Sequence, residues 1–196
     1  MIDYKADPMF WQRFLKCAGF YKGGIDGDFG PNSLQAAHDF EQVSIGIANQ
    51  LTSFDGRSET NIQTLLPAAQ TKAREFMKAV VGAGITIKII SGTRTFAEQD
   101  ALYRQGRDLP GSKVTNARGG QSNHNFGVAW DIGVFRNGQY LDESPVYRQV
   151  GGIGKGLGLE WGGDWKSMTD EPHFQMVPEA DLKAIAAKFE QGITFV

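Results

Sequence analysis

The sequence predicts an α+β fold in two parts. In residues 1–66, apolar residues recur at helical spacing in three short segments, which Asp-Gly loops separate. From residue 67 onward, helical segments alternate with short runs rich in β-branched residues, of which residues 85–90 (ITIKII) are the strongest. A chain of 196 residues can bury a substantial core. We therefore expect an N-terminal three-helix domain over residues 1–66 and a C-terminal domain of strands and helices over residues 67–196.

The composition excludes several classes of protein. The charged fraction of 21% and the hydrophobic fraction of 41% are those of globular domains, and a net charge of -2 gives no electrostatic reason to expect a nucleic-acid partner. No apolar run reaches the ~20 residues of a membrane-spanning helix. The N-terminus lacks the basic and apolar segments of a secretory signal. We expect a monomer that is made in the cytoplasm and does not insert into membranes.

Three helix starts can be read in residues 1–66. Asp7 and Pro8 have the residue types of an N-cap and a first helical position. Pro31 opens a second helix, and Ser58 can cap a short third one that runs toward residues 65–66. Helical spacing predicts that the following residues of the second helix face the core: Leu34, Ala37, Phe40 and Val43.

The segment around the second helix start carries a resemblance. Residues 26–31 (DGDFGP), followed by LQA at 34–36 and FE at 40–41, resemble the three-helix peptidoglycan-binding domains that are attached to many cell-wall hydrolases. Ser33 and Glu41 depart mildly from that pattern, in which threonine and glutamine are frequent. The alternative is a helical cap without a ligand, because Asp-Gly turns and Gly-Pro helix starts are common. His38 lacks metal-binding partners here, and we expect it on the surface.

The C-terminal part begins with a helix over residues 68–81 and a strand over residues 85–90. Thr95 and Glu98 then form a capping box, which predicts a helix from residue 96. Arg94 therefore lies at a strand-to-helix turn, where free backbone N–H groups and a guanidinium favour a substrate carboxylate. An ordinary surface arginine in a loop is the alternative.

Residue patterns in the rest of the chain predict six further segments. In order, we expect a loop over the site, a strand, a loop that passes into a helix ending in glycines, an aromatic pocket wall, a second strand and a C-terminal helix: residues 107–121, 128–135, 140–158, 159–165, 173–177 and 178–189. The last helix is expected to begin at Pro178 and to bury four apolar residues: Leu182, Ile185, Ala186 and Phe189.

Two of the three histidines lie in segments that suit a metal site. His124, Asp131 and His173 supply the two imidazoles and one carboxylate of a catalytic zinc centre. No His-Glu-x-x-His helix is present, so the ligands must come from strands and loops. An extended chain would separate His124 from Asp131 by roughly 20 Å, and they can share a metal only if the chain bends at Gly127. Each residue alone is weak evidence, since a lone histidine before a strand is more often structural.

The spacing of these residues resembles a known signature. SxHxxGxAxD at residues 122–131, followed by DxxHF at 170–174, resembles the D-Ala-D-Ala metallopeptidase group, peptidase M15. That group includes vancomycin-resistance enzymes, L-alanyl-D-glutamate endopeptidases of bacteria and phages, and the hedgehog fold. Residues 91–107 and 160–165 are most similar to the endolysin-type branch. The resemblance implies a hedgehog/DD-peptidase-like zinc domain with an antiparallel sheet and flanking helices.

The resemblance also implies roles for individual residues. Zn²⁺ would be bound by His124, Asp131 and His173. The substrate peptide would be gripped by Arg94, Gln99 and Ser122. Asp170 and Arg94 would be the catalytic side chains.

The choice of general base has two candidates. Strict strand alternation places Glu171 on the face of His173. Pro172, however, biases the preceding residue toward a polyproline conformation, whose three-residue turn returns Asp170 to that face. The family's catalytic acid stands three residues before the histidine, which matches Asp170, and Glu171 is the second choice.

Together these features predict an endolysin-like cell-wall hydrolase. Its partner would be peptidoglycan, through stem peptide and glycan, and the L-Ala-D-Glu bond is the expected point of cleavage. A D-Ala-D-Ala carboxypeptidase or dipeptidase is the alternative enzyme, and a wall-binding protein without catalysis is the alternative from another class. Without a signal peptide, the protein would wait in the host cytoplasm for holin-type release. Phage and bacterial origins both stay open.

Overall fold

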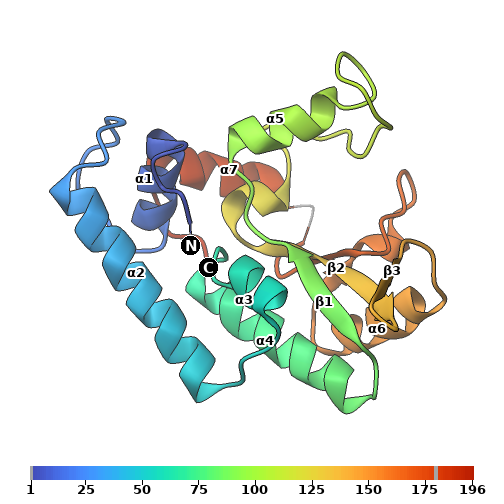
Figure 1. Cartoon of the computed structure of the whole chain (residues 1–196). Coiled ribbons are helices and arrows are strands. Elements are labelled where there is room, and N and C mark those ends of the chain that lie inside the picture. Colours follow the sequence, from blue (N-terminus) through green and yellow to red (C-terminus); the bar gives the residue numbers. More distant parts are fainter. Residues whose placement is uncertain (1, 179–180) are drawn as a thin grey trace.

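The computed structural model describes residues 2–178 and 181–196 and contains a five-stranded antiparallel sheet (Figure 1). Its strands are β1 (Ile87–Ser91), β2 (Ala129–Arg136), β3 (Gln139–Leu141), β4 (Glu160–Trp161) and β5 (His173–Gln175). The order is β1-β2-β5-β4, and β3 forms a hairpin with the end of β2. The expected antiparallel sheet with flanking helices is confirmed.

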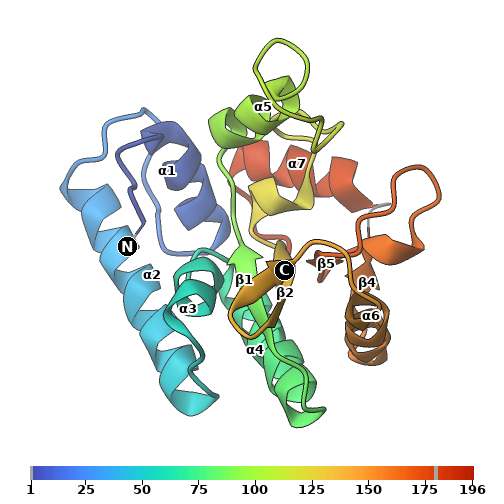
Figure 2. The same cartoon turned by 45° about the vertical axis from the view of Figure 1, so that its right-hand side comes forward.

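Helices surround this sheet on several sides (Figures 1 and 2). The α-helices are α1 (Pro8–Cys17), α2 (Pro31–Gln50), α3 (Gly56–Ile62), α4 (Pro67–Gly82), α5 (Phe96–Arg104), α6 (Val146–Gly156) and α7 (Leu182–Gln191). Two short 3₁₀ helices are η1 (Asn123–Phe126) and η2 (Gly162–Asp164). Among the described helices, none is both long and apolar enough to cross a membrane.

Two hydrophobic clusters form the interior. One joins α4 and α6 to the sheet and contains the large rings Phe76, Trp130 and Phe174. The other cluster is rich in aromatic residues, among them Phe14 and Phe126, and joins α1 and α2 to η1 and α7. Helices α1 and α7 lie side by side although they stand at opposite ends of the chain (Figure 1).

Residues 1–66 contribute to both clusters. Phe14 belongs to the aromatic cluster, and Ile62 and Leu65 belong to the cluster under the sheet. In addition, Ser58 accepts a hydrogen bond from the backbone of Ile89 in β1 at 3.0 Å. The N-terminal helices are therefore packed into the same interior as the strands. The domain boundary between residues 66 and 67 stays a prediction.

The predicted inner face of α2 is wrong at two positions. Leu34 is 50% exposed and Val43 is 40% exposed. The buried stripe consists of Ser33, Ala36, Ala37, Phe40 and Ser44. Successive helical residues are about 100° apart, so Leu34 points away from a stripe that passes through Ser33 and Ala37. This stripe packs against both α1, where Phe40 meets Phe14, and α4, where Ser44 accepts a hydrogen bond from Gln70.

One helix start differs from expectation, and one helix end agrees with it. Asp55, rather than Ser58, caps α3, and its carboxylate accepts the backbone N–H groups of Arg57 and Ser58. Helix α6 ends at Gly156, within the glycine stretch where its end was predicted. A Cβ atom on Gly151 would lie 2.5 Å from the Trp161 ring, so the close approach of helix and strand requires glycine.

The C-terminal helix matches its predicted stripe where the structure describes it. Ile185 and Phe189 are buried, and Leu182 and Ala186 pack against the same cluster. Helix α7 begins at Leu182. The expected start at Pro178 involves residues 179–180, which lie outside the described residues.

The predicted bend at Gly127 is confirmed. This residue follows η1 with a φ of 69°, in the left-handed region that glycine enters without strain. A Cβ atom there would also lie 2.6 Å from the ring of Phe14. The bend therefore requires glycine twice, for its backbone angle and for its contact with α1.

These two requirements can be separated by a pair of alanine variants. Gly138 in the β2–β3 turn has a φ of 78° but no neighbour within 4 Å, so Gly138→Ala carries the backbone strain alone. We expect a loss of about 1–2 kcal/mol for Gly138→Ala and a further loss of about 1–3 kcal/mol for Gly127→Ala, from overpacking against Phe14. Urea unfolding of both variants measures the difference. Equal losses would contradict the close packing of α1 on this bend.

Candidate metal centre

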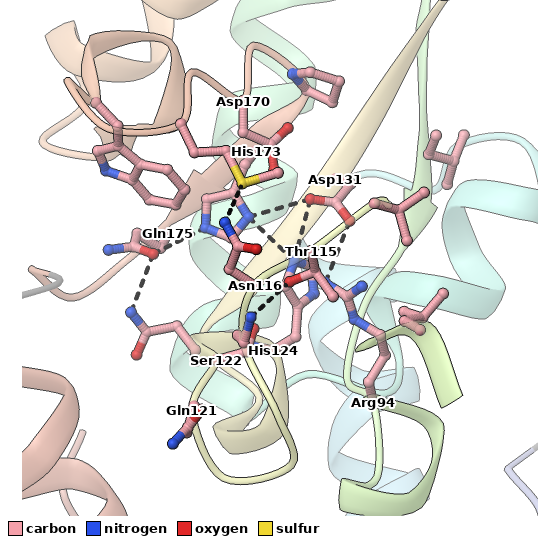
Figure 3. Close-up of a pocket in the computed structure, with 18 of the residues that line it drawn as sticks. Arg94, Thr115, Asn116, Gln121, Ser122, His124, Asp131, Asp170, His173 and Gln175 are labelled. Atoms are coloured by element: carbon pink, nitrogen blue, oxygen red, sulfur yellow. Dashed lines mark hydrogen bonds and ion pairs between the residues drawn. The ribbon is translucent and has the colours of Figure 1, made fainter. Parts of the chain in front are cut away.

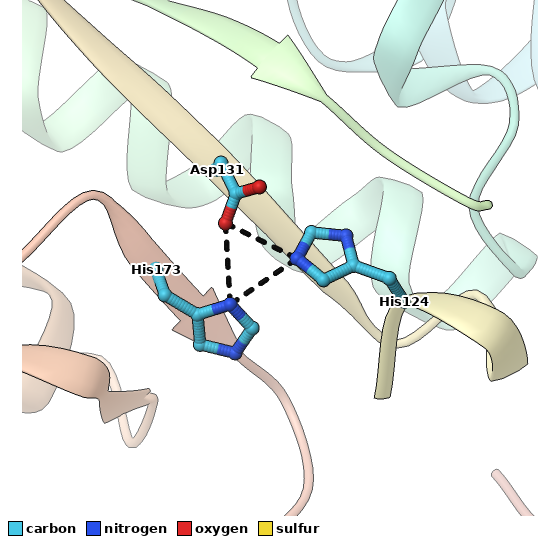
Figure 4. A group of neighbouring side chains, drawn as sticks. All are labelled: His124, Asp131 and His173. Atoms are coloured by element: carbon cyan, nitrogen blue, oxygen red, sulfur yellow. Dashed lines mark hydrogen bonds and ion pairs between the residues drawn. The ribbon is translucent and has the colours of Figure 1, made fainter. Parts of the chain in front are cut away.

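The three predicted metal ligands converge from separate elements (Figure 4). His124 comes from η1, Asp131 from β2 and His173 from β5. Asp131 and His173 are register partners in the β2–β5 ladder, so the sheet itself sets them side by side. The bend at Gly127 returns the chain from η1 into β2, which brings His124 back over Asp131.

The spacing of the facing atoms fits a tetrahedral zinc ion. His124 Nε2 lies 3.1 Å from Asp131 Oδ1 and 3.2 Å from His173 Nδ1, and the latter lies 3.2 Å from Asp131 Oδ1. Zinc–ligand bonds of about 2.0–2.1 Å in a tetrahedron separate the ligand atoms by about 3.3 Å. The triangle therefore has the dimensions of three corners of such a site.

The outer nitrogens of both imidazoles have acceptors that fix their protons. His124 Nδ1 lies 2.7 Å from the carbonyl oxygen of Gly92, which can only accept, so this nitrogen carries hydrogen. His173 Nε2 lies 2.8 Å from Gln175 Oε1. In the neutral rings, both inner nitrogens are then lone-pair acceptors that face the carboxylate of Asp131. Three acceptors this close repel one another unless a cation lies between them.

Burial shapes the protonation of the cluster. Loss of solvation lowers the pKa of His124 to about 4, so its imidazole is neutral, as a metal ligand must be. Burial by itself would raise the pKa of Asp131, but the neighbouring histidines and Arg94 hold it well below its usual range. Burial likewise opposes a charge on His173, yet Asp131 raises its pKa by favouring a proton on the inner nitrogen, and a metal ion would displace that proton. The carboxylate is thus the permanent anion of the site.

Arg94 lies where the sequence predicted, between β1 and the N-cap of α5. Its Nη2 is 3.5 Å from Asp131 Oδ2, and its backbone N–H donates to the carbonyl oxygen of His124. The expected capping box of Thr95 and Glu98 is present. Arg94 therefore touches the metal cluster from one side and lines the pocket above it.

A pocket of about 610 Å³ opens over the cluster (Figure 3). Asp170 lines it beside His173, and its pKa is raised by burial and then by the charge of Asp131. Glu171 points elsewhere and pairs with Arg148 at 3.3 Å. Of the two candidate bases, Asp170 is the one whose carboxylate lies in the pocket.

The two predicted substrate contacts differ in position. Ser122 lines the pocket, and its hydroxyl accepts the backbone N–H of His124 at 3.4 Å. Gln99 is buried outside the described pocket lining and donates to the carbonyl oxygen of Ala117 at 2.9 Å. Gln99 therefore supports the loop that covers the site, and its predicted contact with the substrate stays a prediction. The side chain of Gln99 is buried on α5 and bonds to that loop, outside the lining of the pocket.

Sequence reasoning missed one orienting residue at the site. Gln175 stands two residues after His173 in β5, and strand alternation could have placed it on the ligand face. Asn116 donates to the sulfur of Met168 across the pocket, a contact between two distant loops (Figure 3). Trp165, in the predicted pocket wall over residues 159–165, packs at a tilt against His173 with ring centroids 4.8 Å apart. The loop over residues 107–121 and this wall line the pocket as predicted, although the sequence does not mark their individual contacts.

The sheet and the converging acceptors define a class: a hydrolase of the type that binds its metal with two histidines and one carboxylate. Comparison with known proteins agrees. The profile of a D-alanyl-D-alanine carboxypeptidase family of M15 peptidases matches residues 115–176. The peptidoglycan L-alanyl-D-glutamate endopeptidase CwlK of Bacillus subtilis (strain 168) is 40% identical over 124 residues, which cover 58% of this chain and 74% of CwlK. The chain belongs to the M15 family of zinc peptidases.

Two further proteins are similar over part of the chain. The L-alanyl-D-glutamate peptidase of Listeria phage A118 is 31% identical over 123 residues, which cover 61% of this chain and 40% of the phage protein. Among solved structures, the L-Ala D-Glu endopeptidase ChiX of Serratia marcescens aligns with a TM-score of 0.48 and 26% identity, covering 66% of this chain and 92% of ChiX.

Gln175 provides a test of the orienting bonds. Gln175→Leu removes the acceptor of His173 Nε2–H, so we expect zinc affinity to fall about 10–100-fold. Gln70→Leu is the matched control, because Gln70 is equally buried but bonds to Ser44 and Leu65, away from the site. Competition with a chromogenic chelator measures both affinities. A similar change in the two variants would show that general destabilisation, rather than the lost acceptor, weakens binding.

Proposed function

We propose that this chain is a zinc-dependent peptidoglycan hydrolase that cleaves the L-alanyl-D-glutamate bond of stem peptides. The carrying observation is the triangle of inward-facing acceptors on His124, Asp131 and His173, open to a pocket that also contains Asp170. The names of the relatives CwlK and the A118 peptidase support this bond as the substrate.

The metal would be held by His124 Nε2, Asp131 Oδ1 and His173 Nδ1. A zinc ion in such a site supplies a Lewis acid that polarises a peptide carbonyl and acidifies water. Asp170 acts as the general base: it removes a proton from the attacking water and passes it to the nitrogen of the leaving amine. A raised pKa suits the first step, because it makes the carboxylate a stronger base toward the water, and the leaving amine is a stronger base still and takes the proton in the second step.

Side chains at the rim of the pocket orient the substrate. The guanidinium of Arg94 offers a fork for a carboxylate, and a D-glutamyl residue beside the cleaved bond supplies one. Ser122 contributes a hydroxyl at the same opening. The loop that Gln99 supports covers this side of the pocket and limits the entry of water.

The proposal also covers residues 1–66 and the place where the protein acts. We propose that residues 1–66 contact the peptidoglycan, as their resemblance to wall-binding domains implies. The protein would act on the wall as a monomer after release from the cytoplasm through a holin-type pore. A wall-binding protein without catalysis differs from this proposal in one respect: it would bind purified walls and not lyse them.

A second activity is supported by the description of the matching family profile, D-alanyl-D-alanine carboxypeptidase. Digestion of purified peptidoglycan separates the two, because L-Ala-D-Glu cleavage creates a new N-terminal D-glutamate and carboxypeptidase action releases free D-alanine. We expect the new D-glutamate terminus, seen by mass spectrometry of the muropeptides, and its loss with a chelator. Free D-alanine as the main product would decide for the carboxypeptidase.

The assignment of the base is tested by a pair of neutral variants. Asp170→Asn keeps the size of the side chain but cannot accept the proton, so kcat should fall about 10²–10⁴-fold with zinc still bound. Glu171→Gln, which alters a carboxylate paired with Arg148 outside the metal cluster, should stay close to wild type. Turbidity loss of a wall suspension and metal content are measured for both. Activity lost in Glu171→Gln and kept in Asp170→Asn would reverse the assignment.

A further inference from the structure

We infer that Thr64, in the segment between α3 and α4, is a positioning residue for the metal centre. It holds the backbone that presents the Gly92 carbonyl to His124. The inference rests on the proposed metal site and adds a role for residues 61–66 that binding to the cell wall does not require.

Thr64 and Thr93 form a reciprocal pair of hydrogen bonds. The backbone N–H of Thr93 donates to Thr64 Oγ1 at 2.9 Å, and Thr93 Oγ1 donates to the carbonyl oxygen of Thr64 at 2.6 Å. The Thr64 hydroxyl donates its own hydrogen to the carbonyl oxygen of Asn61 at 2.7 Å. The acceptor lone pair of Thr64 is therefore aimed at Thr93 by the end of α3.

Thr93 lies between two groups that serve the site. Gly92 precedes it, and the Gly92 carbonyl oxygen accepts the Nδ1–H of His124 at 2.7 Å. Arg94 follows it and reaches Asp131. A shift of the Thr93 backbone would therefore move both the acceptor that orients His124 and the guanidinium beside the carboxylate.

The close packing around Gly92 leaves no space for such a shift of the backbone. A Cβ atom on Gly92 would lie 2.4 Å from the carbonyl oxygen of Asn61 and 2.5 Å from Thr64 Oγ1. The backbone that follows β1 therefore packs directly against the backbone at the end of α3. This contact makes the Thr64–Thr93 pair a fixed reference for the Gly92 carbonyl.

The same segment also supports the other side of the ligand turn. The backbone N–H of Leu66 donates to the carbonyl oxygen of Gly127 at 3.0 Å. Residues 61–66 therefore contact the chain at Gly92, which orients the ring of His124, and at Gly127, which ends its 3₁₀ turn. The bonds in both contacts are between uncharged groups, so their effect is geometric.

The test is the zinc dissociation constant of the full chain. Thr64→Val keeps the shape of the side chain and removes the hydroxyl, so we expect the dissociation constant to rise about 10-fold, as for loss of an orienting partner. Thr64→Ser keeps the hydroxyl and should restore wild-type affinity. Thr71→Val is the matched control, because its hydroxyl bonds only to the carbonyl of Pro67 within α4. ¹⁵N NMR of the His124 ring reports whether its Nδ1–H tautomer becomes mixed in Thr64→Val.

The outcomes separate this inference from the proposed function. No zinc binding by the wild type would refute the metal site itself. Zinc binding by the wild type with an unchanged constant and ring tautomer in Thr64→Val would refute the role of Thr64 alone. Should Thr64→Val fail to fold, Thr64→Ala removes the same hydroxyl, the acceptor of the Thr93 N–H, from a smaller side chain, and wild-type affinity in that variant would overturn the inference.

Discussion

Mutual repulsion among three acceptor atoms is the constraint on which the rest of this structure depends. Two imidazole nitrogens and a carboxylate oxygen face one another at 3.1–3.2 Å, and their protons are held on the far side of each ring. Such an arrangement is unfavourable unless a cation neutralises it, so the fold must hold the ligands in place before the metal binds. The free energy for this comes from packing and hydrogen bonds around the site.

The supporting structure has a sheet side and a helix side. The β2–β5 ladder sets Asp131 opposite His173, and Gln175 on the same strand orients the imidazole of its neighbour. On the other side, His124 lies on a short turn between the strand exit at Gly92 and the bend at Gly127. The N-terminal helices touch both of these glycines. Residues that resemble a separate wall-binding unit thus share in the construction of the catalytic one.

Prediction from sequence succeeded where chemistry and local pattern coincide. The capping box of α5 and the glycine bend depend on contacts within a few residues, and both are present. Prediction failed where a side chain's neighbours come from distant segments. Leu34 is exposed because the buried face of α2 passes through Ser33 and Ala37, and the loop partner of Gln99 lies 18 residues away in the sequence. Helical periodicity predicts an apolar face on a helix, but it does not say which edge of that face packs against another helix.

The sequence by itself determined the ligand set, the need for a bend between His124 and Asp131, and the spacing that marks the family. These follow from residue types and from the limited reach of an extended chain. Only the tertiary structure decided that Asp170, rather than Glu171, lies in the pocket, that Gln175 and Gly92 orient the two imidazoles, and that Thr64 stands behind Gly92. The reason is physical: each of these depends on the direction of a side chain or carbonyl relative to a partner that is remote in the sequence, and that direction is set by packing.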